Sequence, residues 1–163
     1  MEAPVGAETN VEREIQRLQS EYWARVDFLD PRPPEELFTA DSEFQLGSLV
    51  LKGRGDLGAF FRQRREASVA NGRTTRHLSA NLRVRSLGAG RAIASTTVLV
   101  MTGYGGFPIE SGAPSIGDFE DVCVLGADGQ WLFERRQATS IFAGPDAPSF
   151  ARAGPASDEQ EGR

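Results

Sequence analysis

The chain has very few residues of the types that build disulfides or metal sites. Its 163 residues include one cysteine, Cys123, and one histidine, His77. A single cysteine cannot form a disulfide within the chain, and this pair provides too few soft ligands for a zinc centre. We therefore expect no metal site.

Long apolar runs and an excess of positive charge are also lacking. No apolar run approaches the roughly 18–20 residues that span a bilayer. The N-terminal stretch MEAPVGAETN has neither the basic start nor the apolar core of a secretory signal. The formal net charge of −5 disfavours contact with a phosphate backbone. The sequence thus predicts a cytoplasmic protein that binds neither nucleic acid nor a membrane.

Composition also indicates where the folded part begins and ends. Hydrophobic residues make up 39% and charged residues 25% of the chain, as in a soluble domain with its own core. Residues 1–8 are small and polar, and residues 144–163 are rich in proline, alanine, glycine and acidic groups. We predict a single domain over residues 9–143, with flexible tails at 1–8 and 144–163.

Hydrophobic periodicity predicts three helices in the first half of the chain. A long first helix is indicated by apolar residues at steps of three and four: Val11, Ile15, Leu18, Tyr22, Val26 and Leu29. The prolines of DPRPPEELF end that helix and permit one short helix. A third helix over residues 53–72 should stop at Asn71–Gly72. Its buried side is expected to contain Leu57, Phe60, Phe61 and Val69.

The remaining segments read as strands. DSEFQLGSLVLKG predicts a hairpin or two short strands, and four longer strand segments follow: TRHLSANLRVRSL, RAIASTTVLVMTGY, SIGDFEDVCVLG and WLFERRQATSIF. A Gly/Pro-rich loop covers residues 105–114, and Asp128–Gly129 marks a hairpin turn. This order predicts an α+β fold in which helices cover one face of a strongly bent sheet.

The same segments, in this order, resemble a known family. YWARVD, LFTADSEF, LKGRGDLGAFF, TRHLSANLRV, IGDFEDVCVLGADGQW and ERR together look like the SnoaL-like branch of the NTF2-like superfamily, over about residues 11–142. The resemblance implies a cone, in which a curved mixed sheet wraps around a pocket and three N-terminal helices close it. Family members include scytalone dehydratase, bile-acid 7α-dehydratase, ketosteroid isomerase and polyketide cyclases, and also non-catalytic β subunits of ring-hydroxylating dioxygenases.

The resemblance implies a catalytic set of Tyr22, Asp27 and His77, since the dehydratases carry a tyrosine and an aspartate on the first helix and a histidine on the strand after the third. A carboxylate orients an imidazole and raises its pKa, so the pair suits proton transfer near neutral pH. We therefore expect the pKa of His77 to be raised. The tyrosine hydroxyl would hold or protonate a carbonyl oxygen. Such chemistry needs no cofactor.

Each of these residues also has a structural interpretation. On a helix turning 100° per residue, Asp27 lies about 140° round from Tyr22, so both reach one cavity only if the sheet wraps around the helix. Asp27 is otherwise a solvated helix residue, Tyr22 a core residue and His77 an exposed strand residue. Strand alternation places His77 and Asn81 on one face, with Leu78 and Leu82 on the other.

The expected substrate-binding residues are Trp23, Phe44, Phe61, Asn81 and Arg136. The family often has an arginine about five residues after the strand tryptophan, which implies that Arg136 orients a pocket carboxylate or a substrate anion. The alternative for Arg136 is an ion pair at the surface or at a sheet edge.

The function predicted first is a cofactor-independent lyase or isomerase, acting by general acid–base catalysis on an apolar cyclic, polyketide-like or steroid-like small molecule. The alternatives are a polyketide-type cyclase and a non-catalytic ligand-binding or assembly subunit. The strand RAIASTTVLVM is apolar on both faces, which is typical of a strand covered on both sides. It predicts a homodimer or homotrimer.

Overall fold

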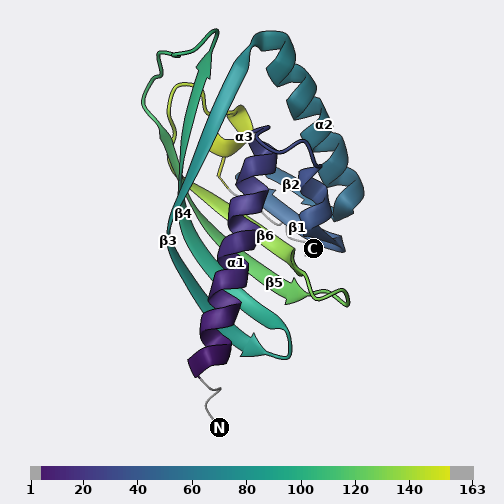
Figure 1. Ribbon diagram of the computed structural model, residues 1–163. Helices are drawn as coiled ribbons and strands as arrows, with labels where there is room; N and C mark the ends of the chain where they lie inside the picture. Colours follow the sequence, from purple (N-terminus) through teal and green to yellow (C-terminus); the bar gives the residue numbers. More distant parts are fainter. Residues whose placement is uncertain (1–4, 155–163) are drawn as a thin grey trace, which may run out of the picture.

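The computed structural model describes the backbone of residues 5–154 and the side chains of residues 10–154 (Figure 1). The helical segments in the first half of the chain are α1 (Val5–Val26), the 3₁₀ helix η1 (Pro34–Leu37) and α2 (Gly53–Asn71). The predicted three N-terminal helices are thus present. The predicted stop of the third is confirmed, since α2 ends at Asn71 and Gly72 follows in the left-handed conformation. No helix within residues 5–154 combines the length and apolarity needed to cross a bilayer.

Six strands form one sheet in the order β2-β1-β6-β5-β4-β3. They are β1 (Phe38–Leu46), β2 (Leu49–Lys52), β3 (Arg73–Gly88), β4 (Arg91–Tyr104), β5 (Ser115–Leu125) and β6 (Trp131–Phe142). Strands β3 to β6 form an antiparallel meander, β1 and β2 a hairpin, and β1 runs parallel to β6. The fold is therefore α+β with a curved mixed sheet, as predicted.

The hydrophobic core lies between the helices and the concave face of the sheet. Helix α1 crosses that face against β3 and β6, and α2 lies beside β1 (Figure 1). Phe38, Phe133 and Ile15 are fully buried there. The prediction that Val69 lies on the buried side of α2 is wrong. Val69 is 76% exposed, and Ser68 is the buried residue of that turn.

Helix α1 ends three residues earlier than the periodicity predicts. Phe28 adopts a left-handed backbone, with φ of 61°. Its N–H donates to the Arg25 carbonyl, and the N–H of Leu29 donates to the Ala24 carbonyl. This is the pair of hydrogen bonds of a Schellman motif, which normally has glycine in the left-handed position. Leu29 therefore lies beyond the helix and is exposed, and Asp27 occupies the C-cap.

A β-bulge divides β3 into two halves that present opposite faces. Asn81 has φ of 56°, and the pairing with β4 shifts register between Ala80 and Arg83. Before the bulge, Thr75 is buried and Leu78 is 57% exposed. After it, Leu82 and Val84 pack against the core. The prediction that His77 and Asn81 share one face is wrong, because the extra residue reverses the alternation.

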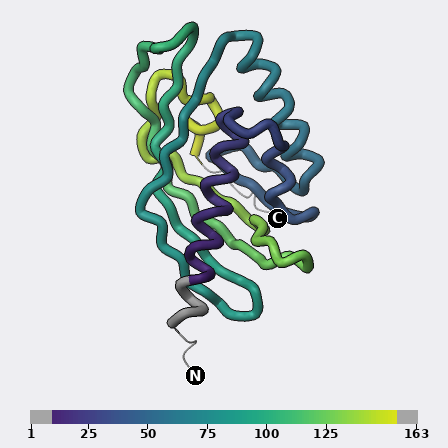
Figure 2. Tube along the Cα trace, in the orientation of Figure 1, coloured from purple at the N-terminus to yellow at the C-terminus, as the bar shows by residue number. Residues whose placement is uncertain are grey.

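The predicted C-terminal tail is wrong for residues 144–154, which form a docked segment that we call the cap. The cap contains the short helix α3 (Ser149–Arg152) and is drawn in yellow in Figure 2. Its Phe150 carbonyl accepts a hydrogen bond from the Ser48 N–H, and Ala151 is buried. The Phe150 ring also lies edge to face against Phe60, with centroids 6.1 Å apart, so these contacts dock a segment whose composition is tail-like. The rest of the predicted tails, residues 1–4 and 155–163, lies outside the described residues.

Replacing Gly47 with alanine is expected to loosen the cap. Gly47 has φ of +57°, and an added Cβ would lie 2.0 Å from the Phe150 carbonyl oxygen. A non-glycine residue in the left-handed region costs about 1–2 kcal/mol, and the clash falls on backbone that cannot rotate away. Amide hydrogen exchange should become faster at Ser48. Gly55→Ala is the matched control, because a Cβ there meets open space. Equal exchange at Ser48 in both variants would contradict this account.

Candidate active site

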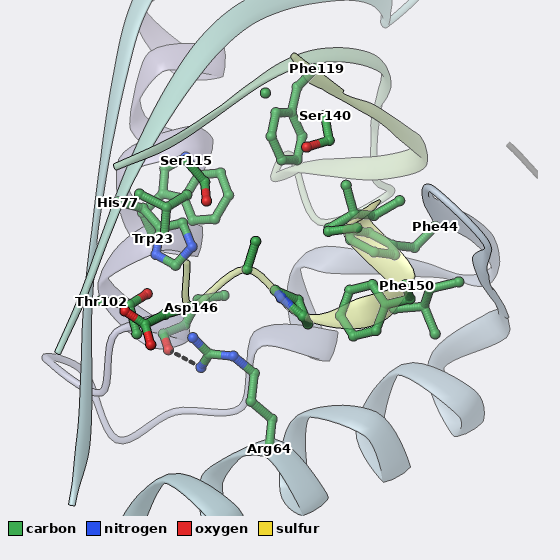
Figure 3. Close-up of a pocket in the computed structure, with 18 of the residues that line it drawn as sticks. Trp23, Phe44, Arg64, His77, Thr102, Ser115, Phe119, Ser140, Asp146 and Phe150 are labelled. Atoms are coloured by element: carbon green, nitrogen blue, oxygen red, sulfur yellow. Dashed lines mark hydrogen bonds between the residues drawn. The ribbon is translucent and has the colours of Figure 1, made fainter. Parts of the chain in front are cut away.

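A cavity of about 140 Å³ lies between α1, α2, the concave face of the sheet and the cap. Its walls are mainly aromatic, with a few hydroxyl and charged groups among them (Figure 3). The aromatic residues of the wall are Tyr22, Trp23, Phe44, Phe60, Phe61, Phe119 and Phe150. A volume of this size accommodates a ligand comparable to benzene while the cap is in place.

Asp27 and His77 form a hydrogen-bonded pair at this cavity. The His77 Nδ1 lies 2.6 Å from the Asp27 Oδ1. The carboxylate is held from two further sides, because Oδ1 also accepts the Thr75 hydroxyl at 2.8 Å and Oδ2 accepts the His77 backbone N–H at 2.7 Å. With the Asp27 carboxylate ionised, Nδ1–H is the donor and Nε2 keeps its lone pair.

The chain places this pair through two local features. The Schellman motif at the end of α1 sets Asp27 at the C-cap, where the side chain turns toward β3 instead of following the helical face. The first half of β3 pairs in regular register with β4, with His77 opposite Val100. The angular separation of Tyr22 and Asp27 on an ideal helix is thereby overcome, since Asp27 lies at the end of the helix.

Burial disfavours the charged form of both partners, but it determines the direction of the pKa shift only for His77. Burial lowers the pKa of His77, and the hydrogen bond and charge of Asp27 oppose this effect without cancelling it. The expectation of a raised His77 pKa is wrong for this reason. Burial alone would raise the pKa of Asp27, but the hydrogen bonds and charge of His77 and the Thr75 hydroxyl together lower it. At neutral pH the pair is thus an ionised carboxylate and a neutral imidazole.

Titration of the single histidine by NMR is expected to give a pKa below the usual value of about 6.5. Asp27→Asn should lower it further, because the hydrogen bond and charge that raise the pKa are removed or weakened. The single imidazole makes the assignment unambiguous. An unchanged His77 pKa in Asp27→Asn would show that the two groups do not interact in solution.

The same shift makes the stability of the fold depend on pH. The folded pKa of His77 lies below its unfolded value, so the unfolded chain takes up a proton first as the pH falls. The contribution of neutral His77 is therefore complete above about pH 6.5 and declines below it. Urea unfolding at pH 7 and pH 5 should show this loss, and His77→Gln should lose less stability over the same interval.

Two aromatic side chains of α1 complete the wall beside the pair. The Trp23 ring stacks on the His77 ring, with centroids 4.3 Å apart and planes at 10°. The Tyr22 ring contacts Trp23 edge to face at 4.7 Å. Burial raises the pKa of Tyr22 to about 12, so its hydroxyl stays protonated and remains a donor. No side chain that the structure describes forms a hydrogen bond with this hydroxyl.

The predicted site residues fall into two groups. Tyr22, Trp23, Phe44, Phe61 and His77 all line the cavity, and Asp27 lies directly behind His77. Asn81 is exposed at the bulge, away from the cavity, together with residues of the outer face of the sheet. Its predicted placement beside His77 fails because the bulge turns it outward.

Arg136 is fully buried beneath the cavity and does not line it. Its Nε lies 3.4 Å from the Asp121 Oδ1, and its Nη2 donates to the Gln19 side chain at 2.9 Å. The guanidinium lies 4.3 Å from the Tyr22 ring centroid and 4.9 Å from that of Trp23. Arg136 therefore orients a core carboxylate and supports the aromatic wall from behind. Both predictions for Arg136 are therefore wrong, because the side chain neither lines the cavity, where it could bind a substrate anion, nor forms an ion pair at the surface.

Several residues of the site were missed by the sequence reasoning. Arg64 on α2 reaches the cavity and donates to the Thr75 hydroxyl at 3.0 Å, which links it to Asp27. Arg73 at the start of β3 and Phe150 of the cap also line the cavity. Arginine-rich RQRR reads as a solvated helix face, so only the tertiary contact distinguishes Arg64. Among the side chains of residues 10–154, no three His, Cys, Asp or Glu residues cluster closely enough to hold a metal ion.

Comparison with known proteins places this geometry in context. Residues 7–137 match the family profile described as a SnoaL-like domain. Among solved structures, a candidate scytalone dehydratase from Novosphingobium aromaticivorans is 24% identical, with a TM-score of 0.74 and coverage of 94% of this chain and 99% of that chain. ActVI-ORFA from Streptomyces coelicolor is 23% identical, with a TM-score of 0.70 and coverage of 84% and 99%. No curated protein sequence matches the chain.

Proposed function

The chain belongs to the family of SnoaL-like domains, and on that premise we propose that it is a cofactor-independent lyase or isomerase of the dehydratase type. Its substrate would be a small cyclic molecule with a carbonyl group and an apolar ring, of polyketide-like or steroid-like character. Asp27 and His77 form the general base, and Tyr22 is the acid or the donor to the carbonyl oxygen. Fold alone does not determine activity, so the proposal depends on the site.

The observation that carries the proposal is the 2.6 Å contact between His77 Nδ1 and Asp27 Oδ1 at the wall of an aromatic cavity. A buried carboxylate that accepts three hydrogen bonds is a fixed group, and it fixes the tautomer of the imidazole. The neutral Nε2 is then a base ready to accept a proton at pH 7. Perturbed titration of paired groups in a cleft is typical of functional sites.

In the proposed reaction, His77 Nε2 removes a proton from the carbon beside the substrate carbonyl. The Tyr22 hydroxyl donates a hydrogen bond to the carbonyl oxygen as it gains negative charge. The imidazolium that forms is stabilised by Asp27. A hydroxyl group on the β carbon then leaves with the proton from His77, as water, and the product is an enone. Return of the proton to another carbon gives isomerisation from the same intermediate.

An assay for enone formation tests this function. A panel of one-ring and two-ring aryl ketones with a hydroxyl on the β carbon is incubated with the protein, and the enone absorbance is followed. The proposal predicts turnover of at least one ketone that binds. Binding of the panel without any turnover or exchange of the proton beside the carbonyl would favour the non-catalytic ligand-binding or assembly subunit. Ring closure in place of loss of water would favour the polyketide-type cyclase.

We also propose that the chain forms a homodimer or homotrimer through the outer face of the sheet. Leu78 on this face is 57% exposed, and β4 carries apolar side chains on the same side, including Leu99 and Met101, which are half-buried. Light scattering at micromolar concentration should give a mass of two or three times 17.7 kDa. Leu78→Glu should shift the species toward the monomer, whereas Val69→Glu, on the exposed side of α2, should not. A monomeric wild type would refute this assembly.

A further inference from the structure

Two arginines, Arg64 and Arg73, contribute to a cavity wall that is otherwise mainly aromatic. Arg64 extends from α2 toward the cavity in Figure 3, and its guanidinium donates to two acceptors. Nη1 donates to the Val26 carbonyl at 2.6 Å, and Nη2 donates to the Thr75 hydroxyl at 3.0 Å. A guanidinium has five N–H donors, so the fixed Arg64 still has donors to offer to a ligand.

Neither guanidinium forms an ion pair with any carboxylate in the described part of the chain. Asp27 is linked to Arg64 only through the Thr75 hydroxyl. Its carboxylate already accepts hydrogen bonds from Thr75, the His77 ring and the His77 backbone. Burial lowers the pKa of Arg64, and the charge of Arg73 lowers it further, so the two cations repel each other. With His77 neutral, two positive charges face one negative charge at the inner wall.

The rim of the cavity does not correct this imbalance. Asp146 of the cap lines the cavity, but its side chain is exposed and it forms no ion pair with the side chains that the structure describes. Solvent screens such a carboxylate strongly. A negatively charged ligand could therefore balance the excess positive charge of Arg64 and Arg73.

We propose that the cavity recognises a ligand in which a carboxylate is attached to an aromatic ring. The carboxylate binds the guanidinium of Arg64, with Arg73 beside it, and the ring lies among the aromatic side chains. A guanidinium and a carboxylate match in planar, two-point geometry. The cavity volume of about 140 Å³ accommodates one such ring. This inference refines the proposed function, on which it rests only for the claim that the bound acid is also the substrate class.

A carboxylate at Arg64 has a consequence for the base. Asp27, Thr75 and Arg64 form one chain of hydrogen bonds, and His77 stands at its other end. An anion bound in the cavity opposes the effect of Arg64 and Arg73 on His77 and raises the pKa of the imidazole. The ligand would thus strengthen the base that acts on it.

Benzoate and benzamide test the site, because they have the same shape and differ in charge. Each is titrated at pH 7 against the full chain, and the NMR signals of His77 and Trp23 report binding. Wild type should bind benzoate on the order of 10-fold more tightly, as expected for hydrogen bonds to a charged group. Saturating benzoate should also raise the pKa of His77. Arg64→Met should remove the preference, and Arg64→Lys should retain part of it.

Two further variants protect the test against misfolding and unspecific charge effects. Arg73→Met should weaken the preference, and Arg73 makes no side-chain hydrogen bond with residues 10–154, so its loss should leave the fold intact. Arg62→Met removes the same charge from an exposed position of α2 and should change nothing. Equal affinities for the two ligands in wild type, including no measurable binding of either, would overturn the proposal. A preference retained in both Arg64→Met and Arg73→Met would overturn it as well.

The outcome is independent of the proposed reaction. Asp27→Asn should still prefer benzoate, because Arg64 and Arg73 remain. Benzoate preference without turnover of any ketone would leave the anion site standing and remove the proposed enzyme. Turnover without any preference for the anion would do the reverse.

Discussion

Asp27→Asn and His77→Gln are each expected to lower kcat for enone formation by about 100-fold or more, the usual contribution of a general base. In Asp27→Asn the amide cannot stabilise the imidazolium, and it holds the imidazole less firmly than a carboxylate that accepts three hydrogen bonds. In His77→Gln the proton acceptor itself is absent. The measurement is the initial rate of enone absorbance under saturating ketone, with the melting temperature recorded for each variant.

The double variant separates a catalytic pair from two independent residues. Groups that act as a unit give strongly non-additive losses, so Asp27→Asn combined with His77→Gln should be little slower than either single variant. Tyr22→Phe is the third member of the series, and it removes the donor while leaving the ring contacts with Trp23 and Phe133 intact. Multiplicative losses of Asp27 and His77 would mean that the two residues act separately.

Arg136→Met is expected to cause the largest loss of stability. Arg136 and Asp121 are both completely inaccessible to solvent. Removing one partner leaves the other buried charge without compensation, which costs roughly 3–5 kcal/mol. For a chain of this size that corresponds to a decrease of roughly 6–20 °C in the melting temperature. The methionine also gives up the contacts of the guanidinium with the rings of Tyr22 and Phe133.

Removing both charges should restore part of this stability, and the buried Gln19 side chain, which loses both partners, limits the gain. The geometry of the pair is imperfect, since Arg136 Nε and Nη1 and Asp121 Oδ1 make no hydrogen bond in the described structure. A pair of this kind gains little beyond the cost of its own desolvation. Arg136→Met combined with Asp121→Leu should therefore unfold at a higher temperature than Arg136→Met alone. Arg135→Met is the control, because Arg135 is exposed on the same strand. A double variant less stable than Arg136→Met would contradict this reasoning.

Much of the fold follows from local signals that the sequence carries openly. The proline-rich break after α1, the Asn71–Gly72 stop and the Asp128–Gly129 turn lie where expected, and the 3.6-residue periodicity of α1 holds as far as Val26. Each of these depends on residues adjacent in the chain. The family resemblance implied a curved mixed sheet, and the parallel pairing of β1 with β6 is what makes the observed sheet mixed.

Two features that were not predicted are left-handed backbone positions without glycine. Phe28 stands in such a position after α1, and Asn81 stands in a bulge of β3. Phenylalanine rarely adopts this conformation, and a single asparagine does not indicate a reversal of strand alternation. A tertiary contact holds the ring of Phe28, since the Arg65 guanidinium lies 4.7 Å from its centroid.

The candidate site shows the same division. Tyr22, Asp27 and His77 were found through the resemblance, whereas Arg64 and the cap were invisible to it because both depend on long-range packing. The sign of the His77 pKa shift was wrong for a related reason. The sequence indicated the contact with Asp27, which raises the pKa of His77. The burial that lowers this pKa by more depends on the packing of the whole cavity.

The bulge at Asn81 sets how the two halves of β3 face relative to each other, so the strand does not tolerate a change in length at this position. The half before the bulge places His77 at the cavity, and the half after it places Leu82 and Val84 against the core. Deleting Asn81 would restore an uninterrupted pleat and set the two halves in competition for one face. If the apolar half keeps its packing, the imidazole of His77 turns outward, away from Asp27 and the cavity. The length of β3 at this one position therefore decides whether His77 and Asp27 can meet.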